Sequence, residues 1–175
     1  AGAEVTHDTK KIFSCPIMLK VEPRTLEEIE MMNMEAILIS AIQLKKKKKE
    51  YFEAITKKKI TSLAFEFIKD SDGSYPAVKS LSEIAGTASV LIAAELMINN
   101  NDGKGLLFGN ITGVPPTEVV ILGAGTVAEY AVRTALSLGA NVKVFDNSIT
   151  KLRRLQNTLN QRIFTSTIHD KALLK

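Results

Sequence analysis

A glycine-rich turn between an apolar strand and a helix holds the residues that could do chemistry. Val119–Leu122 has the continuous apolar character of a strand covered on both faces. The pattern Gly-x-Gly-x-x-Ala follows at Gly123, Gly125 and Ala128. Gly123 permits a tight turn, Gly125 lets the backbone approach a pyrophosphate, and the small Ala128 allows close packing of helix on strand. The pattern predicts a dinucleotide-binding turn.

The segments after this turn make the prediction more specific. The first amides of the predicted helix, at Thr126 and Val127, would point at phosphates, where the helix dipole favours negative charge. Asp146 ends the next strand, 23 residues after Gly123. An acid there hydrogen-bonds the ribose 2′-hydroxyl of NAD and would repel the 2′-phosphate of NADP, so NAD is the expected cofactor. The alternative is a glycine turn used only for packing, with Asp146 as an incidental cap.

Strands alternate with helices on both sides of this motif, which indicates βαβ units and a parallel α/β sheet. In the first part of the chain Thr25 is the expected N-cap of the first helix, and a cluster of turn-forming residues closes the unit at 70–76. The expected elements there are strands Ile17–Val21, Ala36–Ile42 and Thr61–Phe67 and helix Leu26–Met34, with a lysine-rich helix before the third strand.

The second part begins with a capping box, Ser80 with Glu83, that opens a long helix ending near Asn99. A glycine- and proline-marked connector leads to the glycine turn, and Gly139 is the expected C-cap of the helix after it. The remaining expected elements are a strand from Glu118, helix Thr126–Leu138, strand Asn141–Phe145, helix Ile149–Leu159 and strand Arg162–Thr165. We expect three parts, residues 1–79, 80–116 and 117–175.

Composition excludes several classes of protein. The chain is 45% hydrophobic and 24% charged, which is ordinary for a globular protein, and its single cysteine, Cys15, permits no internal disulfide. No charged and apolar leader opens it and no apolar run reaches the length of a membrane span, so we expect a cytoplasmic protein without a membrane partner. His7 and His169 lie in no pattern with a partner, so no metal site is expected.

The net charge of +4 comes from two lysine runs, 45–49 and 57–59. Tyr51, Phe52 and Ile55 lie between the runs at helical spacing, which predicts an amphipathic helix with a solvated lysine face. A site for a phosphate backbone is the alternative, but no arginine and aromatic pattern supports nucleic acid binding.

Two charged residues near strand ends are candidates for a site. Lys20 lies in the apolar strand 17–21, and the ends of parallel strands are where sites lie. Glu66, between Phe65 and Phe67, is either on the polar end of a strand or a buried acid of the site.

The sequence resembles the alanine dehydrogenase and nicotinamide nucleotide transhydrogenase family over nearly its whole length. The connector and turn are the most specific part of the likeness, because connector, turn and acid recur in that order. The stretches that carry it are Leu19–Pro23, Ile60–Glu66, Ser82–Gly86, and Gly103–Gly105 with Gly113–Pro115 running into the glycine turn.

The resemblance implies two Rossmann-like domains with a substrate cleft between them and NAD on the second. It also implies a homo-oligomer and the reversible conversion of L-alanine to pyruvate and ammonia, so the substrate is a small amino acid or 2-oxo acid. In transhydrogenases the same two domains bind NAD(H) and pass hydride to a partner domain. The likeness covers the middle of the family pattern, so both domains are expected to be incomplete in a fragment that is inactive by itself.

Two positions depart from the family pattern in the catalytic half. Lys20 is the only lysine of a motif that has two in the family, and Glu22 lies close to the place of the second. Gln43 occupies the place of the family's catalytic histidine. Glutamine can orient a substrate or a water molecule but cannot exchange a proton near neutral pH. The alternative to a dehydrogenase is therefore a transhydrogenase-like subunit or a regulatory NAD(H)-binding module.

Overall fold

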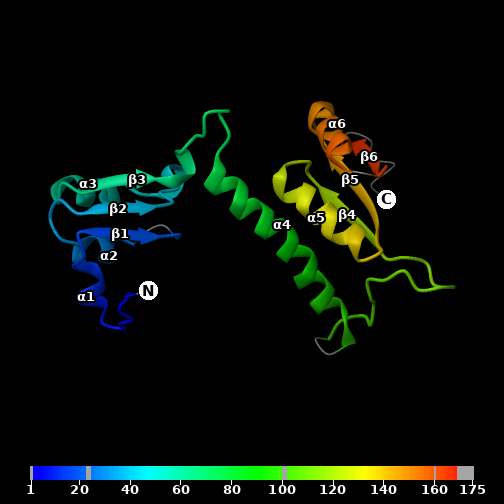
Figure 1. Ribbon diagram of the computed structural model, residues 1–175, viewed down its shortest axis with the longest axis horizontal. Coiled ribbons are helices and arrows are strands. Elements are labelled where there is room, and N and C mark those ends of the chain that lie inside the picture. The colour runs from blue at the N-terminus through cyan, green and yellow to red at the C-terminus, as the bar shows by residue number, and fades with distance from the viewer. Residues whose placement is uncertain (1, 23–24, 100–101, 160, 169–175) are drawn as a thin grey trace. The chain divides into compact units, whose positions relative to one another are not determined.

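The computed structural model describes residues 2–22, 25–99, 102–159 and 161–168. They form two compact units, Ala1–Val78 and Lys79–Lys175. Each unit contains a three-stranded parallel sheet with helices between the strands, so the predicted α/β fold of βαβ units is confirmed (Figure 1).

The first unit orders its strands β1-β2-β3. Phe13, Met18, Ile29, Leu38 and Tyr51 are members of its buried core, so both longer helices of the unit lie on the same face of the sheet. The elements are α1 (Thr9–Phe13), β1 (Ile17–Lys20), α2 (Leu26–Met31), β2 (Ile37–Ser40), the 3₁₀ turn η1 (Leu44–Lys46), α3 (Lys49–Lys57), β3 (Thr61–Ala64) and the 3₁₀ turn η2 (Phe65–Phe67).

The lysine-rich segment folds as its spacing predicted. Tyr51 is 4% exposed, and Phe52 and Ile55 pack against the same core. All eight lysines of the two runs have exposed or half-buried side chains, of which Lys49 and Lys57 lie on α3 itself, and Lys58 donates from Nζ to the Met32 carbonyl at 2.6 Å. The prediction of an amphipathic helix is therefore confirmed.

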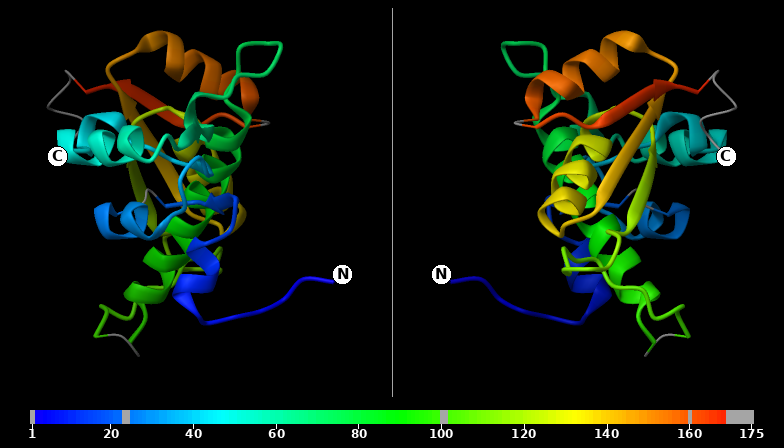
Figure 2. Two further views of the ribbon diagram at one scale, coloured as in Figure 1. Left: turned by 90° about the vertical axis from the view of Figure 1, so that its left-hand side faces the viewer. Right: turned by 90° about the vertical axis from the view of Figure 1, so that its right-hand side faces the viewer.

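The second unit orders its strands β4-β5-β6. Helix α5 packs on β4 and β5, and α6 packs on β5 and β6 (Figure 2). Gly139 has a φ of +82° just after α5, as expected of a residue that ends a helix. The elements are α4 (Pro76–Met97), β4 (Glu118–Leu122), α5 (Thr126–Ser137), β5 (Asn141–Asp146), α6 (Ile149–Thr158) and β6 (Phe164–Thr167).

Helix α4 is long and apolar enough to cross a membrane by length and composition alone, with a mean hydropathy of 1.3. Only Gly86 and Val90 of this helix are buried. Val90 belongs to the core of the second unit, so α4 packs there through a narrow stripe.

Several predicted boundaries were wrong for identifiable reasons. α4 begins at Pro76 and not after Ser80, because proline suits the first turn of a helix, where its missing N–H has no intrahelical partner. The third strand ends at Ala64 because the next three residues form η2. The last strand begins at Phe164, since Ile163 is buried in the core before pairing starts.

Candidate functional site

The glycine turn has the backbone conformation that requires glycine. Gly123 has a φ of +110°, which residues with side chains rarely adopt. Its N–H donates to the Phe145 carbonyl over 2.6 Å, so the turn is tied to β5. A side chain at Gly123 would therefore strain the turn.

Gly125 leaves open space at the start of α5. It is the N-cap, with extended φ of −84° and ψ of −170°, and a Cβ added there would meet no atom within 4 Å. No side chain at the cap accepts a hydrogen bond from the first amides of the helix, whereas serine, threonine or aspartate would. Thr126 and Val127 thus begin a helix whose positive end is available to an anion.

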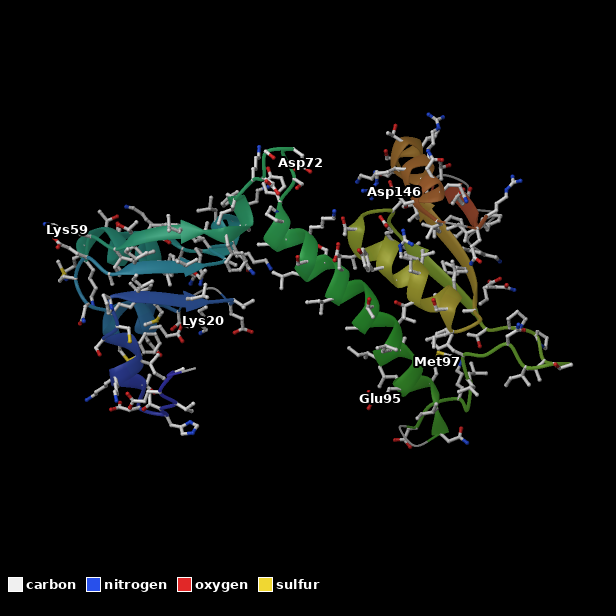
Figure 3. All side chains as sticks on the ribbon, in the orientation of Figure 1. Lys20, Lys59, Asp72, Glu95, Met97 and Asp146 are labelled. Atoms are coloured by element: carbon white, nitrogen blue, oxygen red, sulfur yellow. The ribbon has the colours of Figure 1, made fainter. Side chains whose placement is uncertain are left out.

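Asp146 holds the glycine turn from the end of β5. The carboxylate accepts the Ala124 N–H on Oδ2 and the Ser148 N–H on Oδ1, each over 2.7 Å, and the residue is only 5% exposed. The pKa of Asp146 is lowered from 3.8, first by the Ser148 amide and further by the Ala124 amide and the charge of Lys151, while burial opposes this shift. Asp146, labelled in Figure 3, is therefore an ionised carboxylate whose two hydrogen bonds join the turn to the start of α6.

Both backbone polar groups of Ala124 form hydrogen bonds with side chains. Its N–H donates to Asp146, and its carbonyl accepts a 3.3 Å hydrogen bond from Nη2 of Arg154 on α6. Ala124 is fully buried. Arg154 could not be predicted from the sequence, because the contact spans 30 residues and follows only from the packing of α6.

A cavity of about 520 Å³ adjoins the turn, a size common for small-molecule sites. It brings together Gly123, Gly125, Thr126, Val127 and Ala128, the predicted cofactor residues of the turn and helix. Asp146 contacts the turn through Ala124 and does not line this cavity. The other lining residues are Ser82, Ser89, Val90 and Ala93 of α4, with Phe108, Val119, Val120, Ile121, Leu122 and Ala131.

Gly86 lets α4 approach α5 closely, and other residues of α4 line the cavity. A Cβ at Gly86 would lie 2.3 Å from the Val127 carbonyl oxygen and 2.8 Å from the Tyr130 Cβ. One turn before, Glu83 hydrogen-bonds the Tyr130 hydroxyl and raises the pKa of that tyrosine above 10.0. The contribution of α4 was not predicted from the sequence, although Ser82–Gly86 is among the stretches that carry the family resemblance.

Lys20 lies at the carboxyl end of β1, as expected for a site residue. Its Nζ forms a 2.8 Å ion pair with Glu28 of α2, and both side chains are partly exposed, 32% and 20%. In the sheet register Lys20 pairs with Ser40, which pairs with Ala64, so the three strands end in one row. Ser40 is fully buried.

Gln43 lies three residues beyond this row. Its side chain is exposed and its backbone is left-handed, with a φ of 51°. Glu66, two residues beyond β3, accepts the amides of Ile42 and Gln43 on one oxygen. Among the described residues no group of three histidine, cysteine or acidic side chains could hold a metal ion, and His169 lies outside that part of the chain.

Both halves of the chain match family models. The model described as the alanine dehydrogenase/PNT N-terminal domain matches residues 1–85, and the one described as the alanine dehydrogenase/PNT C-terminal domain matches residues 89–175.

Individual relatives agree with these matches. The alanine dehydrogenase of Mycolicibacterium smegmatis is 34% identical and that of Methanococcus maripaludis 32%, each covering 94% of this chain and 44% of the relative. A solved L-alanine dehydrogenase is 30% identical with a TM-score of 0.80, over 95% of this chain and 46% of that one. A transhydrogenase from Sinorhizobium meliloti, 20% identical with a TM-score of 0.73 over 94% and 46%, shares the fold. The chain thus spans less than half the length of these relatives.

Proposed function

Because the chain belongs to the alanine dehydrogenase/PNT family, we propose that it is part of an NAD-dependent oxidoreductase that interconverts L-alanine with pyruvate and ammonia. The observation that carries this proposal is the glycine turn held by Asp146 beside an open cavity, in the half that matches the C-terminal family model. The relatives named alanine dehydrogenase support the choice of substrate.

The second unit would bind NAD. The start of α5, at Thr126 and Val127, favours the pyrophosphate, and Gly125 leaves room for it because nothing lies within 4 Å of where its Cβ would be. Asp146 is ionised at neutral pH, has a remaining lone pair on each oxygen, and would accept a ribose hydroxyl while it holds the turn. The same negative charge disfavours the 2′-phosphate of NADP.

The first unit would bind the substrate at the carboxyl end of its sheet. Lys20 would attract the substrate carboxylate or carbonyl by charge, and Gln43 would orient the substrate or a water molecule through its amide. Bound NAD supplies the hydride acceptor for alanine oxidation. Because the Gln43 amide cannot exchange a proton near neutral pH, rate enhancement depends mainly on the positions of the reacting groups.

A titration and an activity assay test this proposal on the intact protein. We expect NADH to bind more tightly than NADPH, and we expect turnover with alanine and NAD or with pyruvate, ammonia and NADH. Protein that binds NADH and turns over neither substrate would overturn the alanine assignment, and equal affinity for NADH and NADPH would overturn the role of Asp146. The 175 residues alone are expected to be inactive, since they span 44% of the relatives' length.

A second candidate is a transhydrogenase α-subunit-like or regulatory NAD(H)-binding module. Gln43 favours it, because the amide has no titratable proton near neutral pH. Hydride transfer from NADH to a nucleotide on a partner domain, without deamination of alanine, would support the transhydrogenase version.

We further propose a cytoplasmic homo-oligomer without a membrane or nucleic acid partner. The single cysteine suits a reducing compartment, and the lysines of the two runs are exposed or half-buried on α3 and the turns that flank it. Sedimentation of the intact protein would measure the oligomeric state, and a monomer would overturn that part.

A further inference from the structure

The carboxylate of Glu66 reaches from the end of one strand to the end of the next. Its Oε1 accepts the Ile42 N–H over 2.6 Å and the Gln43 N–H over 2.8 Å, contacts that span 24 and 23 residues. Its Oε2 is enclosed and accepts no hydrogen bond from the residues that the structure describes. The side chain is thus directed at the turn after β2.

The turn that Glu66 binds has an uncommon conformation for its residue. Gln43 has a φ of 51° and a ψ of 55°, in the left-handed region that is unfavourable for a residue with a side chain. Two successive N–H groups that point at one oxygen form an anion-binding concavity. Hydrogen bonds to a charged acceptor are about twice as strong as neutral ones, so Glu66 can offset the backbone strain.

The sheet register places this contact at the proposed substrate edge. Lys20, Ser40 and Ala64 form the last row of the three strands. Gln43 and Glu66 follow that row by three and two residues respectively. Glu66 therefore acts on the backbone of the residue that occupies the catalytic histidine's place.

We propose that Glu66 is a positioning residue that fixes Gln43 in the left-handed conformation and so aims its amide at the substrate. This inference rests on the proposed function for the role of Gln43, but the backbone contact stands independently of it. Glu66 acts through Gln43 and needs no contact with the substrate or the cofactor.

Hydrogen exchange of the intact protein tests the structural half of the proposal. Glu66→Leu keeps the approximate size and removes the acceptor, so exchange at the amides of residues 42 and 43 should accelerate about ten- to a hundredfold. Glu66→Gln keeps one acceptor oxygen and should retain most of the protection. Glu53→Leu is the matched control, because the Glu53 side chain is 61% exposed and forms a surface ion pair with Lys49.

Kinetics of the same variants test the functional half. Glu66→Leu should lower kcat about ten- to a hundredfold with a smaller change in KM, since the misplaced amide acts in the transition state. Glu66→Gln should restore most of kcat. In a Gln43→Ala background Glu66→Leu should cause no further loss, because a positioning residue has nothing left to position.

Two results would overturn the proposal: exchange at residues 42 and 43 in Glu66→Leu that matches the Glu53→Leu control, or an equal loss of kcat with and without Gln43. If the wild-type protein turns over neither alanine nor pyruvate, the proposed function fails. The exchange measurement alone then decides whether Glu66 positions Gln43.

Discussion

In each unit a carboxylate at the end of the sheet accepts two backbone N–H groups, and the units differ in the turn that the carboxylate supports. In the second unit Asp146 is the last residue of the middle strand and accepts one amide on each carboxylate oxygen, from Ala124 and Ser148. The turn that it holds contains Gly123, which tolerates a φ of +110°. In this unit the carboxylate does not have to offset backbone strain. Glycine adopts the conformation without strain, and Asp146 holds the turn in place.

In the first unit Glu66 follows the last strand and accepts two amides on a single oxygen. The turn that it holds contains Gln43 at a φ of 51°, with no glycine to relieve the conformation. Here the carboxylate must offset backbone strain as well as fix the turn. A turn of this kind carries a side chain at the position where a glycine turn leaves open space. The side chain suits the substrate contact proposed for the first unit, and the open space suits the phosphate contact proposed for the second.

The largest effect should come from removing the Asp146 carboxylate. Asp146→Ala leaves the buried amide of Ala124 and the half-buried amide of Ser148 without their charged acceptor, so the free energy of unfolding should fall by roughly 2–4 kcal/mol. NADH affinity should fall at least about tenfold, because the turn loses its support and the ribose loses an acceptor. Urea denaturation and NADH titration measure the two effects. Unchanged stability would show that Asp146 does not support its turn in the way proposed for Glu66.

Asp146 also predicts a pH dependence. Its pKa is lower in the folded protein than the ordinary 3.8, so its contribution to stability is complete well above that value. The contribution is lost as the pH falls through 3.8 toward the lower folded-state pKa. Asp146→Asn should lack this part of the acid loss, so its denaturation midpoint should approach that of the wild type as the pH falls below 3.8. Curves that stay parallel throughout the acid range would contradict this account.

The next largest effect concerns the packing of α4 against α5 beside the glycine turn. Gly86→Ala places a Cβ 2.3 Å from the Val127 carbonyl oxygen, so α4 must shift and stability should fall by roughly 2–3 kcal/mol. Gly125→Ala is the matched control, since nothing lies within 4 Å of its Cβ and its φ of −84° suits alanine. That control should keep the thermal midpoint and lose NADH affinity. If the Gly86→Ala protein is as stable as the wild type, the close packing of α4 on α5 at this position is not required.

The sequence predicted the second unit better than the first because glycine leaves a local mark. The positions of Gly123, Gly125 and Asp146 follow from spacing alone, and the structure places the glycines at the turn and Asp146 beside it. The support from Arg154 could not be predicted, because it depends on a contact across 30 residues. The start of α4 was misplaced because proline is favoured both in turns and at the first position of a helix, so Pro76 does not distinguish them.

In the first unit the sequence named Lys20 and Gln43 chiefly through the family resemblance. Nothing local marks Gln43 as left-handed, since glutamine carries no preference for that region. The two interpretations of Glu66 stayed open because its partners lie 23 and 24 residues earlier. Only the parallel register, which brings the ends of β2 and β3 together, reveals the contact.

A substitution at Gln43 tests whether the substrate side lacks only a proton acceptor. Gln43→His restores the side chain that the family pattern has there, and kcat for alanine oxidation should rise by up to about a hundredfold. The gain should appear as the pH rises through roughly 6.5, where histidine becomes neutral and can accept a proton. Gln43→Asn is the control, with an amide and no titration in this range. No gain at any pH would favour the regulatory or transhydrogenase interpretation.

The smallest expected effect separates strain from function in the first unit. Gln43→Gly relieves the left-handed backbone, which costs a residue with a side chain about 1–2 kcal/mol, while glycine's freedom in the unfolded chain takes back about 0.5–1 kcal/mol. Stability should therefore rise slightly or stay level, although kcat falls because the amide is gone. Glycine would also make the turn less dependent on Glu66, so Glu66→Leu should destabilise the Gln43→Gly protein less than the wild type. Urea denaturation of the four proteins gives this difference, and an equal cost in both backgrounds would mean that Glu66 does not offset strain at Gln43.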